Sequence, residues 1–243
     1  CPTVFFGLYG LPDFYTLWNH KGRKAILWAG SDIRHFVNGY WLEDNAKGIK
    51  IEPRVLAPWI NKHCENWVEN EKERRMLKEY GINLQVCPSF LGDVNKFDLS
   101  YRWSKKPKVY TSVSGDDFRL YGWYDIDTLA RKNSDIEFHL YGNKKEWKTR
   151  RSNVFVHGQV SKEKMNKEIK EMQGAIRLVD LEGFSEIVAK SLLWGQWPIS
   201  VIDYPFTLPM SDLEILKYKK TPNISGQDYY RGILNRYPWN SNL

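Results

Sequence analysis

The chain has 243 residues, 42% of them hydrophobic, enough to bury the core of one large domain or two small ones. No apolar run reaches about 18 residues, which excludes a membrane-spanning helix. The formal net charge of +7 favours a nucleic acid, an anionic membrane or a phosphorylated donor as partner, but a solvated lysine-rich surface explains it equally well. The three cysteines show no disulfide or zinc spacing and favour a reducing cytoplasm.

The first half of the chain predicts short strands with less regular segments between them. Strands are expected at residues 3–9, 25–30, 54–59 and 82–88. A long helix is expected at about residues 65–80, because Gly81 then ends it. Residues 94–108 are polar, basic and without a periodic pattern, which predicts an interdomain linker.

The second half alternates strands and helices. Strands are expected at residues 109–114, 136–142, 153–158, 175–180 and 198–203. Helices are expected at about residues 126–132, 162–173, 185–194 and 227–237. The second of these helices has Ser161 as its N-cap, Met165, Ile169 and Met172 on one face, and Gly174 at its end. Such alternation predicts a parallel sheet covered on both faces, with ligand sites at the carboxyl ends of its strands.

Residues 175–199 carry the strongest chemical signal. A strand leads into a short loop that contains Gly183, and a helix then begins at Ser185. A helix N-terminus after a glycine turn is suited to a phosphate, because its free N–H groups and its dipole favour an anion. Glu182, in the loop, can accept hydrogen bonds from sugar hydroxyls. By the pattern alone, an ordinary tight loop explains these residues as well.

At this stretch the sequence resembles the group 1 glycosyltransferases of the GT-B fold, which are retaining and family 4-like. The family motif is E-G-F-G, then E-A-M-A-C-G, then a P-V-I strand. This chain has Glu182-Gly183-Phe184-Ser185, then residues 190–195, then residues 198–199, with the same spacing. Residues 136–142 and 156–160 resemble other elements of the family, in the right order. The resemblance implies an α/β fold of two Rossmann-like domains with a cleft between them.

The resemblance implies a compact member of the family with three parts. Residues 1–97 are then expected to form a short acceptor-side domain, residues 105–222 the nucleotide-sugar donor domain, and residues 223–243 a helix that returns to the first domain. Glu182 then bonds the donor sugar hydroxyls, and backbone groups of Gly183, Phe184 and Ser185 meet the sugar and the diphosphate. Gln159 and Val160 meet the nucleobase edge. No cofactor or metal is required, because fixed charges and the helix dipole support the leaving diphosphate.

The sequence departs from the family pattern at the charged positions. Lys190 stands where the second motif glutamate holds the donor ribose; it is expected either to contact a hydroxyl or phosphate or to face solvent. The family's diphosphate-binding arginine and lysine align near Asp116 and Tyr121. Arg119 is the cation in this segment, and is assigned either to the diphosphate or to the surface. Arg177, inside a strand, is expected to pair with an acid or to point into the cleft.

In the first domain, Ser31 and Asp32 follow a strand and precede a helix, in a turn that looks like the G-S-D turn of some relatives. Asp32 is interpreted either as the N-cap of that helix or as a residue that orients the acceptor; with Glu182 it is a candidate catalytic residue. Gly7, Gly10 and Asp13 follow the first strand and, together with Ser31, are assigned to the acceptor side. Their spacing is not the dinucleotide-binding fingerprint.

Metal chemistry finds little support in the sequence. Asp125 and Asp127 have the D-x-D form of metal-dependent transferases, but they begin a helix, so capping is the better account. The five histidines lack metal-ligand spacing. His139 is expected to be structural, and His157 lies next to the base-binding turn.

The implied activity is hexosyl transfer from a nucleotide sugar to a hydroxyl of a saccharide or lipid-linked acceptor. The expected location is the cytoplasm, with or without peripheral contact with a membrane surface. Two alternatives remain open. One is a non-catalytic module that binds sugar nucleotides, and the other is a glucosyltransferase that acts on DNA.

Overall fold

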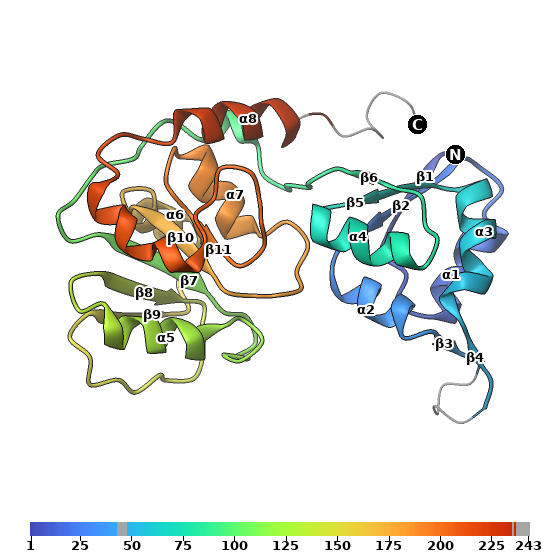
Figure 1. Cartoon of the computed structure of the whole chain (residues 1–243), viewed down its shortest axis with the longest axis horizontal. Coiled ribbons are helices and arrows are strands. Elements are labelled where there is room, and N and C mark those ends of the chain that lie inside the picture. Colours follow the sequence, from blue (N-terminus) through green and yellow to red (C-terminus); the bar gives the residue numbers. More distant parts are fainter. Residues whose placement is uncertain (43–47, 235, 237–243) are drawn as a thin grey trace. The chain divides into compact units, whose positions relative to one another are not determined.

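The computed structural model describes residues 1–42, 48–234 and 236, and these divide between two compact units (Figure 1). The first unit holds Cys1–Phe90 and Leu181–Phe184, with the described residues from Ile233 onward. The second unit holds Leu91–Asp180 and Ser185–Gly232. Each unit has its own parallel sheet and its own helices, which confirms the prediction of two Rossmann-like α/β domains.

The sheet of the first unit has the strand order β1-β2-β5-β6, and all its pairs are parallel. The strands are β1 (Thr3–Phe6), β2 (Lys24–Trp28), β5 (Glu65–Val68) and β6 (Gln85–Val86). The helices are α1 (Leu11–Asn19), α2 (Ser31–Val37), α3 (Pro53–His63) and α4 (Glu71–Glu79). A short antiparallel pair, β3 (Tyr40–Trp41) with β4 (Lys50–Ile51), lies outside this sheet. Ile26, Trp28 and Phe36 are fully buried in the core.

Two elements of the first unit differ from the prediction. The strand expected at residues 54–59 is part of α3, in which Leu56 and Ile60 are buried one turn apart and Pro53 occupies the first turn. A proline is tolerated there because the first N–H groups of a helix have no intrahelical partner. The helix expected at residues 65–80 is strand β5 followed by α4. Asn70 separates them, because its side chain accepts the Glu73 N–H and caps α4.

The sheet of the second unit has the order β11-β10-β7-β8-β9, again all parallel. The strands are β7 (Lys108–Ser112), β8 (Glu137–Tyr141), β9 (Val154–Gly158), β10 (Gly174–Arg177) and β11 (Ile199–Ser200). The helices are α5 (Trp123–Lys132), α6 (Lys162–Ile169), α7 (Glu186–Leu193) and α8 (Ile224–Leu234), with 3₁₀ helices at Val94–Lys96 and Met210–Tyr218.

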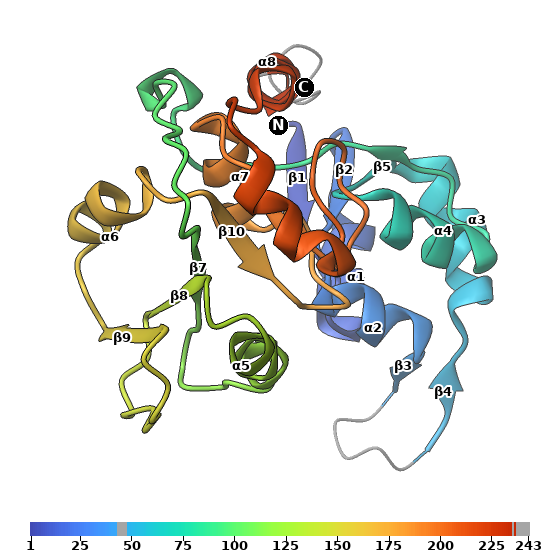
Figure 2. The same ribbon diagram turned by 60° about the vertical axis from the view of Figure 1, so that its left-hand side comes forward.

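The side chains of β8 alternate between the two faces of this sheet. Phe138 and Leu140 are buried in the same apolar cluster as Ile126 of α5. Tyr141 lies on the opposite face, where its hydroxyl donates to Glu168 of α6. Figures 1 and 2 accordingly show α5 and α6 on different sides of β7, β8 and β9. The sheet is therefore covered on both faces, as the sequence predicted.

The segment expected to be a linker, residues 94–108, groups with the second unit. The Trp103 indole N–H donates to the Lys217 carbonyl (2.9 Å), and the Tyr101 hydroxyl donates to the Lys219 carbonyl. We expected residues 223–243 on the first domain. Residues 223–232 instead group with the second unit, and the described residues from Ile233 onward group with the first. The reason is visible at Gln227, whose side-chain amide donates to the Leu193 carbonyl (2.6 Å). Residues 235 and 237–243 lie outside the described residues.

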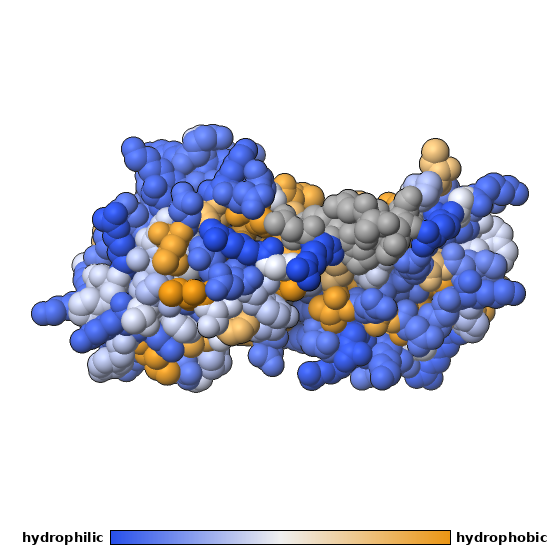
Figure 3. Space-filling model, turned by 90° about the horizontal axis from the view of Figure 1, so that it is seen from above, coloured by the Kyte–Doolittle hydropathy of each residue, from blue (hydrophilic) through white to orange (hydrophobic). Residues whose placement is uncertain are grey.

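The face in Figure 3 carries mainly hydrophilic side chains, with small separate groups of hydrophobic ones. Of the helices in the described parts of the chain, none is both long enough and apolar enough to span a membrane.

Candidate functional site

A pocket of about 430 Å³ lies at the carboxyl ends of β8 and β9. It is lined by Asn143, Lys144, Lys145, Glu146, Val156, His157, Gly158 and Gln159. Loops at this end of parallel strands are where open α/β sheets bind their ligands. The pocket contains Gln159, one of the two residues expected at a nucleobase, while the second, Val160, is half-buried next to it. Two lysines against one glutamate give the lining a net positive formal charge.

Two contacts fix the loop that forms one wall of this pocket. Gly142 has φ +83°, and a Cβ there would lie 2.3 Å from the Val113 carbonyl oxygen, so the turn after β8 requires glycine. The Asp116 carboxylate accepts the backbone N–H groups of Lys144 and Lys145, the latter at 2.9 Å. These hydrogen bonds hold the pKa of Asp116 below its usual value. Asp116, which aligns with the family arginine, therefore orders the pocket wall.

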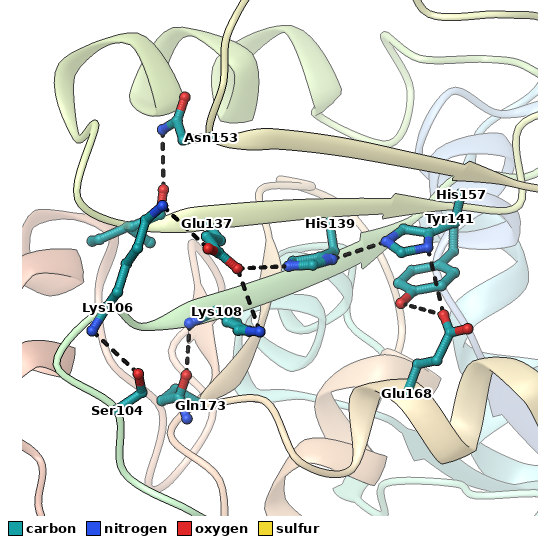
Figure 4. A network of polar contacts seen from close by, with 11 residues as sticks. Ser104, Lys106, Lys108, Glu137, His139, Tyr141, Asn153, His157, Glu168 and Gln173 are labelled. Carbon is teal, nitrogen blue, oxygen red and sulfur yellow. Dashed lines mark hydrogen bonds and ion pairs between the residues drawn. The ribbon is translucent and has the colours of Figure 1, made fainter.

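A chain of polar side chains leads away from the pocket across the sheet (Figure 4). Glu137, His139 and Tyr141 alternate along β8 and so lie on one face. His139 Nδ1 is 2.9 Å from His157 Nε2, and the Tyr141 hydroxyl donates to Glu168 Oε2 at 2.9 Å. His139 Nε2 and His157 Nδ1 lie 3.6 Å and 3.5 Å from carboxylate oxygens of Glu137 and Glu168. His157 thus connects the pocket lining to a network with a carboxylate at each end.

The two histidines of this network share one hydrogen between them. One ring nitrogen must donate and the other accept, so the contact requires at least one neutral imidazole. Burial lowers the pKa of His139 to about 4, and a positive charge on His157 acts in the same direction. Burial also lowers the pKa of His157. Both rings are therefore neutral near pH 7, and His139, stacked on Phe155 with ring centroids 4.9 Å apart, is well placed for the structural role expected of it.

The two arginines assigned to the donor have different surroundings. Arg119 is exposed in the segment between β7 and α5. Arg177 is buried at the end of β10, where its guanidinium donates to the Ser112 carbonyl at 3.0 Å. The same guanidinium lies 4.6 Å from the centre of the Tyr121 ring. The guanidinium of Arg177 therefore packs against the ring of Tyr121, the residue that aligns with the family lysine.

Lys190 does not face solvent, which corrects one of the two readings of this residue. It is buried on α7, with Nζ 2.9 Å from Glu186 Oε1, one turn earlier in the helix. Lys162 of α6 lies 3.5 Å from the same carboxylate oxygen. Ser185 occupies the N-cap position of α7 and is buried, but its side chain makes no capping hydrogen bond.

The loop Leu181–Phe184, which carries the motif residues, belongs to the first unit by its contacts. The Phe184 N–H donates to Glu69 Oε2 at 2.9 Å, and the Asn70 side-chain amide donates to the Glu182 carbonyl at 2.9 Å. Gly183 and Phe184 are buried, and Glu182 is half-buried. Sequence reasoning missed Glu69 and Asn70. Their position directly after a strand could have identified them, but residues 65–80 were predicted to be a single helix, so no strand end was expected there.

Asp32 is buried in the first turn of α2, with Oδ1 accepting the Ala29 N–H at 3.0 Å. The N-cap of α2 is Gly30, so the interpretation of Asp32 as the N-cap is wrong. The carboxylate instead closes the turn between β2 and α2, which begins at Ser31. Burial raises the pKa of Asp32 to about 6, against the lowering effect of backbone N–H groups, of which Ala29 is the first.

The residues assigned to the acceptor side partly come together. A Cβ at Gly7, which has φ +79°, would lie 3.1 Å from Asp32 Cβ, so the end of β1 meets the turn after β2. Asp13 accepts the Tyr9 N–H at 2.8 Å and so fixes the loop between β1 and α1. Gly10 is the N-cap of α1. Their binding roles remain predictions.

Among the described residues of the first unit, three carboxyl groups have raised pKa values. Besides Asp32, burial raises the pKa of Glu69 and lifts that of Glu73 to about 9. The negative charges of Glu69 and Asp32 add to the effect on Glu73.

Within the described residues, no group of three or more His, Cys, Asp or Glu is arranged to hold a metal ion. The D-x-D pair lies in α5, where Asp125 is in the first turn and Asp127 is 3.1 Å from Arg151.

Searches with the sequence match no protein-family model and no curated protein. Solved structures are similar to the chain at 12% identity. TarM matches with a TM-score of 0.56, over 96% of this chain and 50% of TarM, so the chain spans half the length of that protein. Sucrose-phosphate synthase from Thermosynechococcus elongatus matches with 0.61, over 96% and 69%. The lipopolysaccharide outer core galactosyltransferase WaaB matches with 0.51, over 98% and 95%.

These relatives are glycosyltransferases of the GT-B fold with two Rossmann-like domains. The chain therefore has the GT-B fold, as its resemblance to the group 1 enzymes predicted. At 12% identity the likeness shows the fold alone.

Proposed function

We propose that the chain is a glycosyltransferase that moves a hexose from a nucleotide-sugar donor to an acceptor hydroxyl, without a metal ion and with retention at the anomeric carbon. The observation that carries the proposal is the pocket at the carboxyl ends of β8 and β9. It lies in the unit to which the resemblance assigns the donor, and it includes Gln159, one of the two residues assigned to the nucleobase. Its size suits a small-molecule site.

The residues divide the work of binding the donor. Gln159 and backbone groups near it offer hydrogen bonds to the base edge, and Lys144 and Lys145 attract a negatively charged ligand. The N-terminus of α7, at Ser185, favours the diphosphate through its dipole. Glu182 accepts hydrogen bonds from the sugar hydroxyls. In the transfer, the bond from the anomeric carbon to the diphosphate breaks, the bond to the acceptor oxygen forms, and the acceptor proton passes to the leaving phosphate.

The nature of the donor and acceptor has support from one relative. A structure of a mutant of S. aureus TarM, similar to this chain with a TM-score of 0.52 and 12% identity, contains UDP and alpha-GlcNAc-glycerol. A uridine diphosphate sugar and a saccharide or lipid-linked acceptor are therefore the first substrates to test. The three cysteines are unpaired, which fits the cytoplasmic location that we propose.

The test begins with thermal unfolding in the presence of UDP, GDP, ADP, TDP and CMP, each followed by its sugar conjugates. A ligand that binds only the folded state at a concentration of about 100 Kd stabilises it by roughly 2.7 kcal/mol. Gln159→Ala should reduce the shift, whereas the exposed Arg131→Ala on α5, outside the pocket lining, should leave it unchanged. If none of the nucleotides stabilises the protein, the proposal fails.

Transfer is then measured with the donor that binds, against saccharide, lipid-linked and duplex DNA acceptors. Glucosylation of DNA would show binding that weakens steeply with salt, because the contacts release counterions from the phosphates. If sugar is transferred to DNA and to neither of the other acceptors, DNA replaces the saccharide as the proposed acceptor.

A non-catalytic sugar-nucleotide binding module is the second candidate. The observation that favours it is the ion pair between Lys190 and Glu186, where the family has a glutamate for the ribose. A single-turnover assay with excess protein separates the two, since a binding module leaves the nucleotide sugar intact.

A further inference from the structure

Two consecutive residues after β5 hold the loop Leu181–Phe184 on both sides of Gly183. Glu69 accepts the Phe184 N–H through Oε2 at 2.9 Å. The Asn70 side-chain amide donates to the Glu182 carbonyl at 2.9 Å. Because these contacts are to backbone atoms, they fix the course of the loop from which the Glu182 side chain projects.

Both holding side chains are themselves fixed by neighbours. The other oxygen of Glu69, Oε1, accepts the backbone N–H of Ser89 at 3.3 Å and also the Ser89 hydroxyl. Asn70 Oδ1 accepts the Glu73 N–H at 3.0 Å, in its role as N-cap of α4. Glu69 is 5% exposed and Asn70 is 3% exposed. Each polar end is therefore oriented on two sides and shielded from water, which strengthens its hydrogen bonds.

Gly183 is required by the same contact. A Cβ at this position would lie 1.7 Å from Glu69 Oε2, closer than any side chain can approach. The glycine of the Glu182-Gly183-Phe184 motif thus leaves room for a carboxylate that reaches the next backbone N–H. The Phe184 N–H is already bound by this carboxylate, so it is not available to a donor phosphate while the contact persists.

We propose that Glu69 is a positioning residue that sets the donor loop, and with it the direction of the Glu182 carboxylate toward the donor sugar. Asn70 holds the other side of the same loop. The inference rests on the proposed function for its donor, but the contact of Glu69 with the loop can be measured without any donor.

Amide hydrogen exchange of residues 178–190 measures the contact directly. In Glu69→Ala, the Phe184 N–H loses its carboxyl acceptor and should exchange about ten- to hundred-fold faster. Glu69→Gln, which keeps the side-chain volume, should show a smaller increase, because an amide can present its oxygen to only one of its two partners. Glu79→Ala is the matched control: Glu79 is an exposed carboxylate on α4, so the variant should leave Phe184 protected. Unchanged exchange at Phe184 in both Glu69 variants overturns the proposal.

A double-variant experiment tests the link to the donor sugar. Gly183→Ala alone should weaken binding of the nucleotide sugar by about tenfold or more and leave binding of the bare nucleotide diphosphate nearly unchanged, since the added methyl group displaces the loop. In the Glu69→Ala background the same methyl group has space, so the second substitution should add little. Independent effects that multiply would show that Gly183 and Glu69 do not act through one contact, and would overturn the proposal.

The two measurements separate this inference from the proposed function. If Glu69→Ala speeds exchange at Phe184 but wild-type protein binds no nucleotide sugar, the proposed function fails, and Glu69 orders the loop for another purpose. If the wild type transfers sugar and the Glu69 variants keep its affinity for the sugar, the donor part of this inference fails while the proposed function stands.

Discussion

Glu73→Gln should make the stability of the protein much less sensitive to a rise in pH from about 5 to 8. Glu73 lies on α4 with 0% of its surface exposed, and its pKa is raised from 4.5 to about 9, first by burial and then by the charges of Glu69 and Asp32. Between these two values the carboxyl group is protonated in the folded state and ionised in the unfolded state. Its contribution to stability is therefore complete below pH 4.5 and is lost as the pH rises toward 9.

The magnitude follows from the proton balance. Each pH unit in this window lowers the free energy of unfolding by about 1.4 kcal/mol, so the three units from pH 5 to pH 8 amount to roughly 4 kcal/mol. Glutamine has nearly the same shape and stays neutral at every pH, so it removes this loss. Asp32, with a pKa raised from 3.8 to about 6, affects mainly the acidic end of the window.

The assay is urea denaturation of wild type and variant at pH 5, 6, 7 and 8, followed by tryptophan fluorescence. Glu79→Gln is the matched control, since Glu79 is exposed on the same helix. The difference in unfolding free energy between Glu73→Gln and wild type should increase steadily with pH, while Glu79→Gln follows the wild type. Parallel curves for Glu73→Gln and wild type would refute a protonated Glu73 in the folded protein.

Three further predictions concern the site. Burial lowers the pKa of His139 from 6.5 to about 4, so wild type should lose roughly 3 kcal/mol of stability as the pH falls through this range. His139→Gln should remove most of that loss. If the unfolding free energy of the variant falls with pH as steeply as that of wild type, this prediction is wrong. Glu182→Gln should reduce sugar transfer about ten- to hundred-fold and keep affinity for the nucleotide diphosphate; full transfer with a lowered Tm would exclude sugar binding by Glu182. Turnover should survive EDTA, and a loss restored by manganese would implicate Asp125 and Asp127.

Most of the secondary structure of the second unit could be predicted from the sequence. Each of its five predicted strands overlaps an observed one, because short β-branched or aromatic runs there are bounded by Gly, Pro, Asn or Asp. The middle helix begins after Ser161, whose side chain accepts the Lys164 N–H as an N-cap should. The motif at Glu182 kept its family spacing, and that spacing predicted the GT-B fold that the structural similarity confirms.

The first unit was harder to predict, since its signals are ambiguous at short range. Residues 55–60 form an apolar run that contains Pro58, and such a run predicts a strand more readily than the interior of α3. The buried carboxyl groups were not predictable at all. Asp32 and Glu73 lie on α2 and α4 and Glu69 directly follows β5, and only the tertiary packing removes them from water together. The contact of Glu69 with Phe184 joins residues 115 positions apart.

Restoring the family glutamate at position 190 should not restore a ribose contact by itself. Lys190 Nζ is 2.9 Å from Glu186, and the Lys190 side chain is only 7% exposed, so Lys190→Glu would place two carboxylates one helical turn apart with Lys162 as their shared cation. Losing the buried hydrogen bond costs about 1–3 kcal/mol, so the single variant should melt earlier and bind the donor no better. The exchange Glu186→Lys with Lys190→Glu keeps the pair and should recover most of the lost stability, less a few tenths of a kcal/mol because a lysine then opposes the dipole at the start of α7. Melting temperature and nucleotide-sugar affinity, measured on the single and the double variant, decide the matter. A single Lys190→Glu variant that binds the donor more tightly at an unchanged melting temperature would show that the ion pair does not set the chemistry of this position.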